Sequence, residues 1–324
     1  MNDPNFDCTA KLKPYPKEPW GATGGLIHQK PMICGGLIKT RVDKESGAGI
    51  KMPNQAKPSF SQACYALQED GSWKEEEATL SKGRMWYGSG SVVLNDELVI
   101  ARGLGRFGDD MSKSIEVVGG RITKARTLED IELPQETYRS CIVPWDADTF
   151  MVIGGNPYKY GGGGMDAYSQ TGTYFVDIKK KTVTNGPDLN NARYRHGCSE
   201  MIVDGEEFIV VTGGHGPKES VHKSTEYLSK ASFKTDGWQE GTDLPVGISE
   251  HQMVTSPDKQ FVYTIGNGFR PYDKESSQEI YKYTCQNNDI KQCIWTKSKT
   301  KLKYGRRYLV AFGIPNSWAK NICE

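Results

Sequence analysis

The chain of 324 residues lacks three features that often reveal a function early: a long apolar run, an excess of charge and a large set of histidines. No apolar stretch reaches the roughly eighteen residues of a membrane-spanning helix, so no span is expected. The 41 basic residues balance 40 acidic ones, which leaves no long-range field to recruit nucleic acid or an anionic membrane. Residues 1–19 are polar and proline-rich, without the apolar centre of a secretory signal.

Motifs that bind metals or phosphate are also missing. The eight cysteines form no C-x-x-C pair and share no zinc-ligand spacing with the five histidines. The glycine run at residues 161–164 lacks the following Lys-Ser/Thr of a phosphate loop. His196 and His251 precede expected strands, where a ring nitrogen usually satisfies a turn carbonyl, and His215 has no evident nucleophile or carboxylate partner. We therefore expect no cofactor and no metal.

What the sequence does contain is an aliphatic run that ends in closely spaced glycines and recurs five times. Successive copies lie 68, 51, 59 and 53 residues apart, counted from the first glycine of each: Gly35, Gly103, Gly154, Gly213 and Gly266. Short runs rich in Val, Ile and Phe that stop at glycine are typical of strands buried on both faces. The period fits a four-stranded propeller blade. The glycines are expected to permit positive φ and close backbone approach where blades crowd together.

Other landmarks keep the same order within each unit. A strand with an aromatic or aliphatic residue follows each glycine pair, and a later strand carries Trp73, Trp238 or Trp295 in three units. A proline turn, and often an arginine, then precedes the next unit. This order, over nearly the whole chain, resembles the Kelch repeat, in which a glycine pair, a tyrosine, a tryptophan and a later arginine mark one blade. Unit two, which has no tryptophan, and unit three, with Val183 in its place, depart from the pattern and predict less regular outer strands.

The resemblance implies a single all-β domain over residues 1–324, a Kelch-type β-propeller with five complete four-stranded blades and an incomplete sixth blade shared by the N- and C-termini. The expected blades are residues 21–80, 87–133, 138–188, 195–245 and 250–300, with the partial blade at 5–16 and 306–315. Because its two middle strands have no sequence here, we favour a chain that lacks about thirty to forty upstream residues. The alternatives are a ring that tolerates a gap or closes with five blades. An unpaired inner strand would promote aggregation.

Cysteine positions predict cross-links. The candidate pairs are Cys285 with Cys293, Cys34 with Cys64, and Cys8 with Cys323. The first two pairs would face each other across neighbouring strands of one blade, and the third would join the chain ends. Cys141 and Cys198 lie on adjacent inner strands and are expected to be two buried thiols that line the channel. Paired cysteines favour an extracellular location; the absence of a signal segment and of any Asn-x-Ser/Thr acceptor keeps a cytoplasmic one as the alternative.

Two classes of connection should emerge on one face: those from outer to inner strands and those after the glycine pairs. Such loops commonly carry recognition, and arginine and tyrosine are enriched at binding hot spots. The candidate binding residues on them are Arg84, Tyr87, Arg106, Arg139, Asn156, Arg195, His215, Asn267, Arg270 and Arg306. In Kelch adaptor proteins, arginines at matching blade positions engage acidic peptides, which implies an analogous role here. Any one arginine can instead make a structural contact that recurs from blade to blade.

We therefore expect a non-catalytic module that binds a protein or peptide partner through one face, and that is monomeric if the ring is complete. Galactose oxidase has a Kelch-like propeller, but its copper site needs two tyrosines and two histidines with a cysteine-linked tyrosine, and no such set is recognisable. Bacterial sialate mutarotases are similar in fold and size, so a carbohydrate-active or carbohydrate-binding propeller is the alternative. A carboxylate facing His215 or Arg195 in the channel would discriminate between the two.

Overall fold

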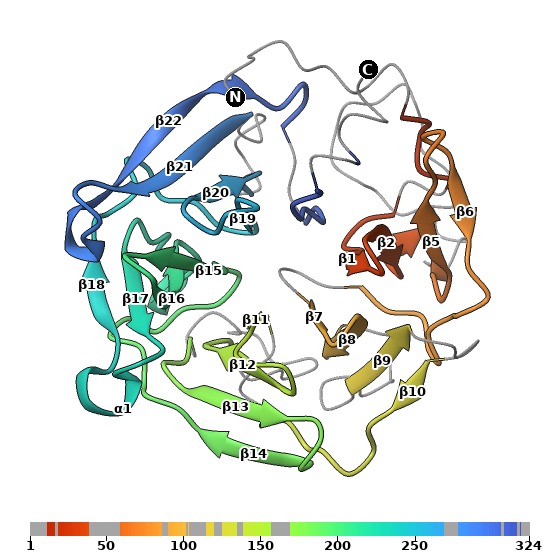
Figure 1. Cartoon of the computed structure of the whole chain (residues 1–324), viewed down its shortest axis with the longest axis horizontal. Helices are drawn as coiled ribbons and strands as arrows, with labels where there is room; N and C mark the ends of the chain where they lie inside the picture. The colour runs from red at the N-terminus through yellow and green to blue at the C-terminus, as the bar shows by residue number, and fades with distance from the viewer. Residues whose placement is uncertain are drawn as a thin grey trace.

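The computed structural model describes residues 12–16, 19–38, 59–85, 90–101, 103, 115–119, 125–134, 139–156, 169–268, 278–305, 308–315 and 318. Within these residues nearly all regular structure is strand. Five four-stranded antiparallel sheets surround a common centre and form a β-propeller (Figure 1). Among the described residues no helix has the length and apolar character needed to cross a membrane.

In the first three blades the strands run outward from the centre in chain order. Blade one has β1 (Thr23–Ile27), β2 (Lys30–Cys34), β5 (Cys64–Leu67) and β6 (Trp73–Glu75), and the short β3 (Leu37–Ile38) and β4 (Ser59–Phe60) pair beside it. Blade two has β7 (Ser91–Leu94), β8 (Glu97–Ala101), β9 (Ile115–Gly119) and β10 (Arg126–Thr127). Blade three has β11 (Cys141–Pro144), β12 (Thr149–Ile153), β13 (Thr173–Asp177) and β14 (Thr182–Asn185). The outer strand β10 is only two residues long, as predicted for unit two, whereas β14 pairs regularly over four residues.

The last two blades contain the longest strands. Blade four has β15 (Gly197–Val203), β16 (Glu206–Thr212), β17 (Thr225–Ser229) and β18 (Gln239–Gly241), with η4 (Pro217–Glu219) and α1 (Phe233–Asp236) in its connections. Blade five has β19 (Gln252–Thr255), β20 (Val262–Ile265), β21 (Glu279–Cys285) and β22 (Cys293–Lys301), with η5 (Ile290–Gln292) before β22. The predicted five-blade architecture is confirmed.

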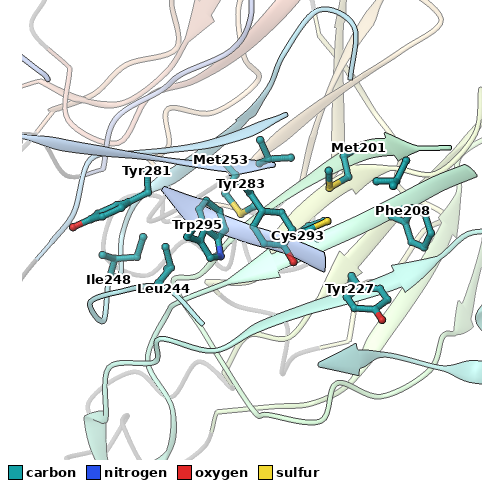
Figure 2. Close-up of a cluster of buried hydrophobic side chains, with 13 residues drawn as sticks. Met201, Phe208, Tyr227, Leu244, Ile248, Met253, Tyr281, Tyr283, Cys293 and Trp295 are labelled. Atoms are coloured by element: carbon teal, nitrogen blue, oxygen red, sulfur yellow. The ribbon is translucent and has the colours of Figure 1, made fainter. Parts of the chain in front are cut away.

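The hydrophobic core lies between blades. The cluster between blades four and five joins Met201 and Phe208 of blade four to Met253, Tyr283 and Trp295 of blade five, all under 9% exposed (Figure 2). Second strands such as β12 and β16 contribute apolar residues to both of their faces, which explains their continuous aliphatic sequence. Each large apolar side chain buried in this way stabilises the fold by about 1.5–3 kcal/mol.

The tryptophans of the outer strands link each blade to the segment that precedes it. Trp238 donates its indole N–H to the carbonyl oxygen of Pro187 (3.0 Å), and Trp295 donates to Oγ1 of Thr225 (2.9 Å). Trp73 of blade one donates to the carbonyl oxygen of Lys13 (3.2 Å). The N-terminal segment therefore occupies, beside blade one, the position that a preceding blade has elsewhere.

The glycine pairs bring neighbouring blades into backbone contact. The second glycine of a pair donates its N–H to the connection that enters the next blade: Gly36 to Arg84, Gly155 to Arg193 and Gly214 to Ile248, each over 2.8 Å. Gly214 has φ +89°, and a Cβ atom there would lie 2.7 Å from Cβ of His196. The predicted positive φ and close approach are confirmed, and the two classes of connection share one face.

A second set of backbone hydrogen bonds runs around part of the channel at that face. Five connections into an inner-strand position contain one described residue with positive φ, at Gly21 (65°), Arg139 (58°), Arg195 (55°), Glu250 (58°) and Tyr308 (51°). The amide of Arg195 donates to Arg139 O (2.9 Å), Glu250 to Arg195 O (2.8 Å), Tyr308 to Glu250 O (3.2 Å) and Gly21 to Tyr308 O (3.1 Å). We call these five residues the junction ring.

The C-terminal segment lies between blade five and blade one (Figure 1). Tyr308 joins the junction ring as if it began a sixth blade. However, residues 308–315 form no strand, so the predicted innermost strand of the shared blade is not formed there. Ile314 and Trp318 pack with Leu12, Leu67 and Trp73, so both ends of the described chain contact the third and outer strands of blade one. The predicted contribution of residues 5–11 lies outside the described residues.

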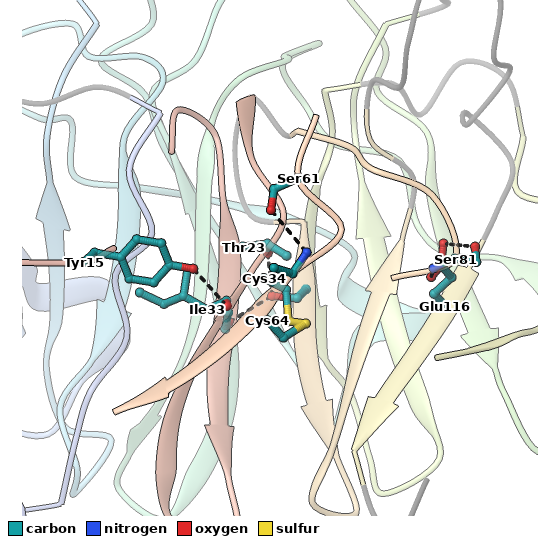
Figure 3. Close-up of a disulfide and its surroundings, with 11 residues drawn as sticks. Tyr15, Thr23, Ile33, Cys34, Ser61, Cys64, Ser81 and Glu116 are labelled. Carbon is teal, nitrogen blue, oxygen red and sulfur yellow. Dashed lines mark hydrogen bonds between the residues drawn. A yellow bond between two sulfur atoms is a disulfide. The ribbon is translucent and has the colours of Figure 1, made fainter. Parts of the chain in front are cut away.

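Three disulfides are present among the described residues. Cys34–Cys64 (Figure 3) and Cys285–Cys293 join directly paired positions of neighbouring strands, which confirms both predictions. Cys141 and Cys198 are also bonded, so the prediction of two separate thiols is wrong: the adjacent strands β11 and β15 bring their Cα atoms to 6.0 Å, within bonding range. Cys8 and Cys323 lie outside the described residues. Three disulfides point to an oxidising, extracellular environment.

Candidate functional site

Arginines near the entry to the blades fall into two structural groups. Arg84 and Arg193 are buried and pair with Glu116 on β9 and Glu226 on β17, at 2.6 Å in the second case. Each pair is fully enclosed, with side chains no more than 1% exposed. Burial lowers the pKa of Arg84 to about 10 and lowers that of Arg193 as well. This is the recurrent structural contact, so the assignment of Arg84 to a binding surface is corrected.

The buried carboxylates have further partners that fix the incoming connections. Glu226 accepts hydrogen bonds from the amides of Asn190 (2.6 Å) and Asn191 (3.1 Å), while Arg193 donates to the carbonyl oxygen of Gly213 (2.9 Å). Glu116 accepts from both the amide and the hydroxyl of Ser81 at 2.8 Å (Figure 3). These networks hold the connection rigidly against the third strand of the blade that it enters.

Arg139 and Arg195 form the second group, in the junction ring and half-buried. Their guanidinium carbons lie 5.9 and 5.8 Å from the centre of the Tyr194 ring, within cation–π range. Tyr194 is itself 1% exposed and stacks on His215, with ring centres 5.3 Å apart. Two cationic groups are therefore held beside one buried aromatic support.

Glu250 supplies a carboxylate at the same place. Its Oε1 lies 2.5 Å from Nη1 of Arg195 and accepts a hydrogen bond from the hydroxyl of Tyr308. The Glu250 side chain is 4% exposed and that of Arg195 is 20% exposed. A Cβ atom at Gly268 would lie 2.1 Å from Oε2 of Glu250, so the last glycine of unit five makes room for this carboxylate. Arg139, Tyr194, Arg195, Glu250 and Tyr308 are called the mouth cluster below.

The other predicted site residues are distributed differently. Asn156 and Asn267 are at most 3% exposed, and Asn267 accepts a hydrogen bond from the amide of Ser249 (3.2 Å). His215 contributes to the mouth cluster as the stacking partner of Tyr194. Four predicted residues lie outside the described residues: Tyr87, Arg106, Arg270 and Arg306.

Sequence reasoning missed Tyr194, Glu250 and Tyr308 as site residues. A signal for two of them was present: Glu250 and Tyr308 precede their inner-strand positions just as Arg139 and Arg195 do. Aligning the units on this position would have found both. Tyr194 carries no comparable signal, because its role depends on stacking with His215, which follows the glycine pair of unit four.

His196 and His251 are fully buried in successive blade junctions. The ring of His196 lies against Gly154, and that of His251 lies against Gly213. Burial, followed by the positive charge of Arg193, lowers the pKa of His251 to about 3 and lowers that of His196 well below its usual value. Both imidazoles are therefore neutral and fill space between blades. No group of three or more metal-ligating side chains occurs among the described residues.

The central channel contains a cavity of about 600 Å³. Its lining begins beside the junction ring at Ala22 and Gln252 and continues along the inner strands to the turns at Asp96 and Lys259. These turns join first to second strands, so they are at the face opposite to the mouth cluster. Residues 310–315 form one wall of the cavity.

The fold defines the class of molecule: a β-propeller of five four-stranded blades, with the mouth cluster at one end of its channel. Among solved structures, the chain resembles the structure of YjhT, with a TM-score of 0.64 and 12% sequence identity over 89% of this chain and 86% of that chain. At this identity the likeness shows the fold alone. No protein-family model matches the chain, and no curated protein matches it in sequence.

Proposed function

We propose that the chain is a binding module that takes an acidic protein or peptide segment at the channel mouth, in the manner of Kelch-type propellers. The observation that carries the proposal is the placement of Arg139 and Arg195, two residues of the junction ring, beside the ring of Tyr194. Arginine and tyrosine dominate binding hot spots, and guanidinium groups recognise carboxylates with two parallel hydrogen bonds. The hydrogen bonds of the junction ring fix the backbone of both arginines before a ligand arrives, which lowers the entropic cost of binding.

The acidic character of the partner follows from charge. Glu250 is the carboxylate that faces Arg195, while two guanidinium groups share the Tyr194 support. Guanidinium groups recognise carboxylates, here on a chain whose overall charge is balanced. The resemblance to the Kelch repeat supports the same kind of partner.

An array of acidic and matched amide-substituted peptides tests this proposal. We expect binding to peptides with two or more closely spaced carboxylates, weakened at high salt and lost when Glu and Asp are replaced by Gln and Asn. Arg139→Ala should reduce affinity at least about tenfold, which corresponds to about 1.4 kcal/mol. Arg126→Ala, on the outer strand β10, is the matched control. Equal binding of acidic and amide peptides would contradict the proposal.

A second candidate is a carbohydrate-active propeller of the sialate mutarotase type. The specific observation in its favour is the buried carboxylate of Glu250, which faces Arg195 and accepts a hydrogen bond from Tyr308. A carboxylate beside a guanidinium and a phenol can bind a sugar acid and transfer a proton, as opening and closing a sugar ring requires. Following the anomers of N-acetylneuraminate by NMR tests it. Acceleration that Glu250→Gln abolishes and Glu97→Gln retains would favour this function, and exchange at the buffer rate would exclude it.

A further inference from the structure

The channel cavity has the size and composition of a small-molecule site. Its volume of about 600 Å³ lies within the range of pockets that enclose small ligands, roughly 300–1,000 Å³. The lining reaches Asp96 and Lys259, whose side chains are 61% and 39% exposed, so the cavity meets solvent at the face opposite to the mouth cluster. None of the five mouth-cluster residues lines it.

Most of the wall is apolar. The inner strands contribute Leu26, Val93, Val143 and Val254, and the C-terminal segment contributes Val310 and Phe312. Val254 is half-buried although it lies on an inner strand, as expected for a side chain that borders an internal space. Apolar surface of this extent favours a ligand with an apolar body.

Hydroxyl groups form two polar points on opposite parts of the wall. Thr23 and Ser91 share a hydrogen bond of 2.6 Å between blades one and two, and Ser91 also donates to Gly24 O (2.9 Å). Ser199 and Thr255 are paired between blades four and five. Each hydroxyl oxygen has two lone pairs, so an engaged hydroxyl retains capacity to accept a hydrogen bond from a ligand.

The charged groups of the lining are few. Glu200 pairs with Lys259 (3.0 Å) and with Lys230 (3.4 Å), and Asp96 lies at the opening with its side chain 61% exposed. A charged ligand in the enclosed part of the cavity would have to give up its hydration beside groups that are already paired with each other.

We propose that the central channel binds a neutral, mainly apolar small molecule that carries one or two hydroxyl groups. The apolar body would lie against residues 310–315 and the aliphatic residues of β1, β7 and β19. A ligand hydroxyl would hydrogen-bond to the Ser199–Thr255 or the Thr23–Ser91 pair. Specificity then comes from the position of these hydroxyls on a rigid wall.

The neutral fluorophore N-phenyl-1-naphthylamine tests the cavity directly. We expect a saturable rise in fluorescence with a stoichiometry of one. Val254→Phe should fill part of the cavity and weaken binding by about tenfold or more, whereas Val246→Phe, at an exposed position outside the cavity, should stay within about twofold. Ala311→Phe repeats the test from the segment that belongs to no sheet, in case Val254→Phe disturbs β19.

A competition series tests whether a ligand hydroxyl forms a hydrogen bond to the cavity wall. 2-Naphthol should displace the fluorophore about fivefold more tightly than naphthalene, the effect of one hydrogen bond, and 2-naphthalenesulfonate should compete least. Ser199→Ala should reduce the naphthol advantage, with thermal unfolding confirming that the fold is intact. The site would be overturned if the fluorophore did not bind saturably, or if Val246→Phe weakened its binding as much as Val254→Phe does. Equal affinities for naphthol and naphthalene would overturn the assigned ligand class.

Discussion

The amide of Tyr308 donates a hydrogen bond to the carbonyl oxygen of Glu250 over 3.2 Å, and its hydroxyl donates to the carboxylate of the same residue. Tyr308 also packs edge-to-face on Trp20, with ring centres 4.9 Å apart. One residue of the C-terminal segment thus joins blade five to the entry of blade one and orients the carboxylate of the mouth cluster.

Tyr308 should therefore stabilise the fold through its hydroxyl as well as through its packing. Tyr308→Phe keeps the packing but removes the hydrogen bond to a charged acceptor, and we expect a loss of about 1.5–3 kcal/mol in the free energy of unfolding. Urea unfolding measures it. Tyr304→Phe is the matched control, because Tyr304 is 59% exposed. Equal stability of the two variants would contradict this role of Tyr308.

Arg193 should be a structural residue whose loss costs far more than the loss of a surface arginine. Arg193→Ala leaves Glu226 buried without its cation, and we expect about 3–5 kcal/mol of destabilisation. Arg126→Ala breaks the partly exposed Arg126–Glu97 pair (2.7 Å) and should cost at most about 1 kcal/mol. Denaturant unfolding of both variants makes the comparison, and similar losses would show that the buried pair is not a structural anchor.

The two buried histidines predict acid sensitivity. Burial and Arg193 lower the folded-state pKa of His251 to about 3, so as the pH falls His251 takes up a proton in the unfolded chain before it does so in the folded one. The contribution of neutral His251 to the free energy of unfolding is therefore complete above about pH 6.5 and declines as the pH falls below that value. Between pH 7.5 and pH 5 this amounts to about 2 kcal/mol for His251. His196 acts in the same direction, because burial, followed by the positive charge of Arg193, lowers its pKa as well.

Unfolding curves at several pH values test this prediction. His251→Gln should make the fall in stability between pH 7.5 and pH 5 smaller by about 2 kcal/mol. His28→Gln, at a side chain 62% exposed, is the matched control. If both variants retain the full decline, the acid sensitivity has another source.

The glycine pairs predict a difference between two alanine substitutions. Gly205 (φ +78°) has no atom within 4 Å of an added Cβ, whereas Cβ at Gly214 (φ +89°) would meet His196 at 2.7 Å and the carbonyl oxygen of Tyr194 at 2.8 Å. Gly205→Ala should cost about 1–2 kcal/mol from backbone conformation alone. Gly214→Ala should cost about 1–3 kcal/mol more because blades must move apart. Thermal or urea unfolding that ranks the two equally would show that blade crowding is unimportant here.

The sequence was informative where structure is local or repeated. The strands, the glycine conformations, and the Cys34–Cys64 and Cys285–Cys293 bonds all involve neighbouring strands of one blade, so spacing predicted them. It was uninformative where partners come from different blades. Cys141 and Cys198 are 57 residues apart, and Tyr308 and Glu250 are 58 apart; nothing in either local pattern identifies the partner. Arg84 was predicted as a binding residue because its partner Glu116 lies 32 residues away and has no signal in the local pattern.

The central claim is that an acidic segment binds at the channel mouth, and a comparison of two charge reversals tests it most directly. Arg139→Glu changes the mouth, and Lys74→Glu makes the same change of charge at an exposed position of the outer strand β6. The measurement is the titration of a fluorescent acidic peptide, selected on the array, against both variants at equal ionic strength. We predict that Arg139→Glu abolishes binding while Lys74→Glu keeps the wild-type affinity within about twofold. Equal affinity in the two variants would contradict the account.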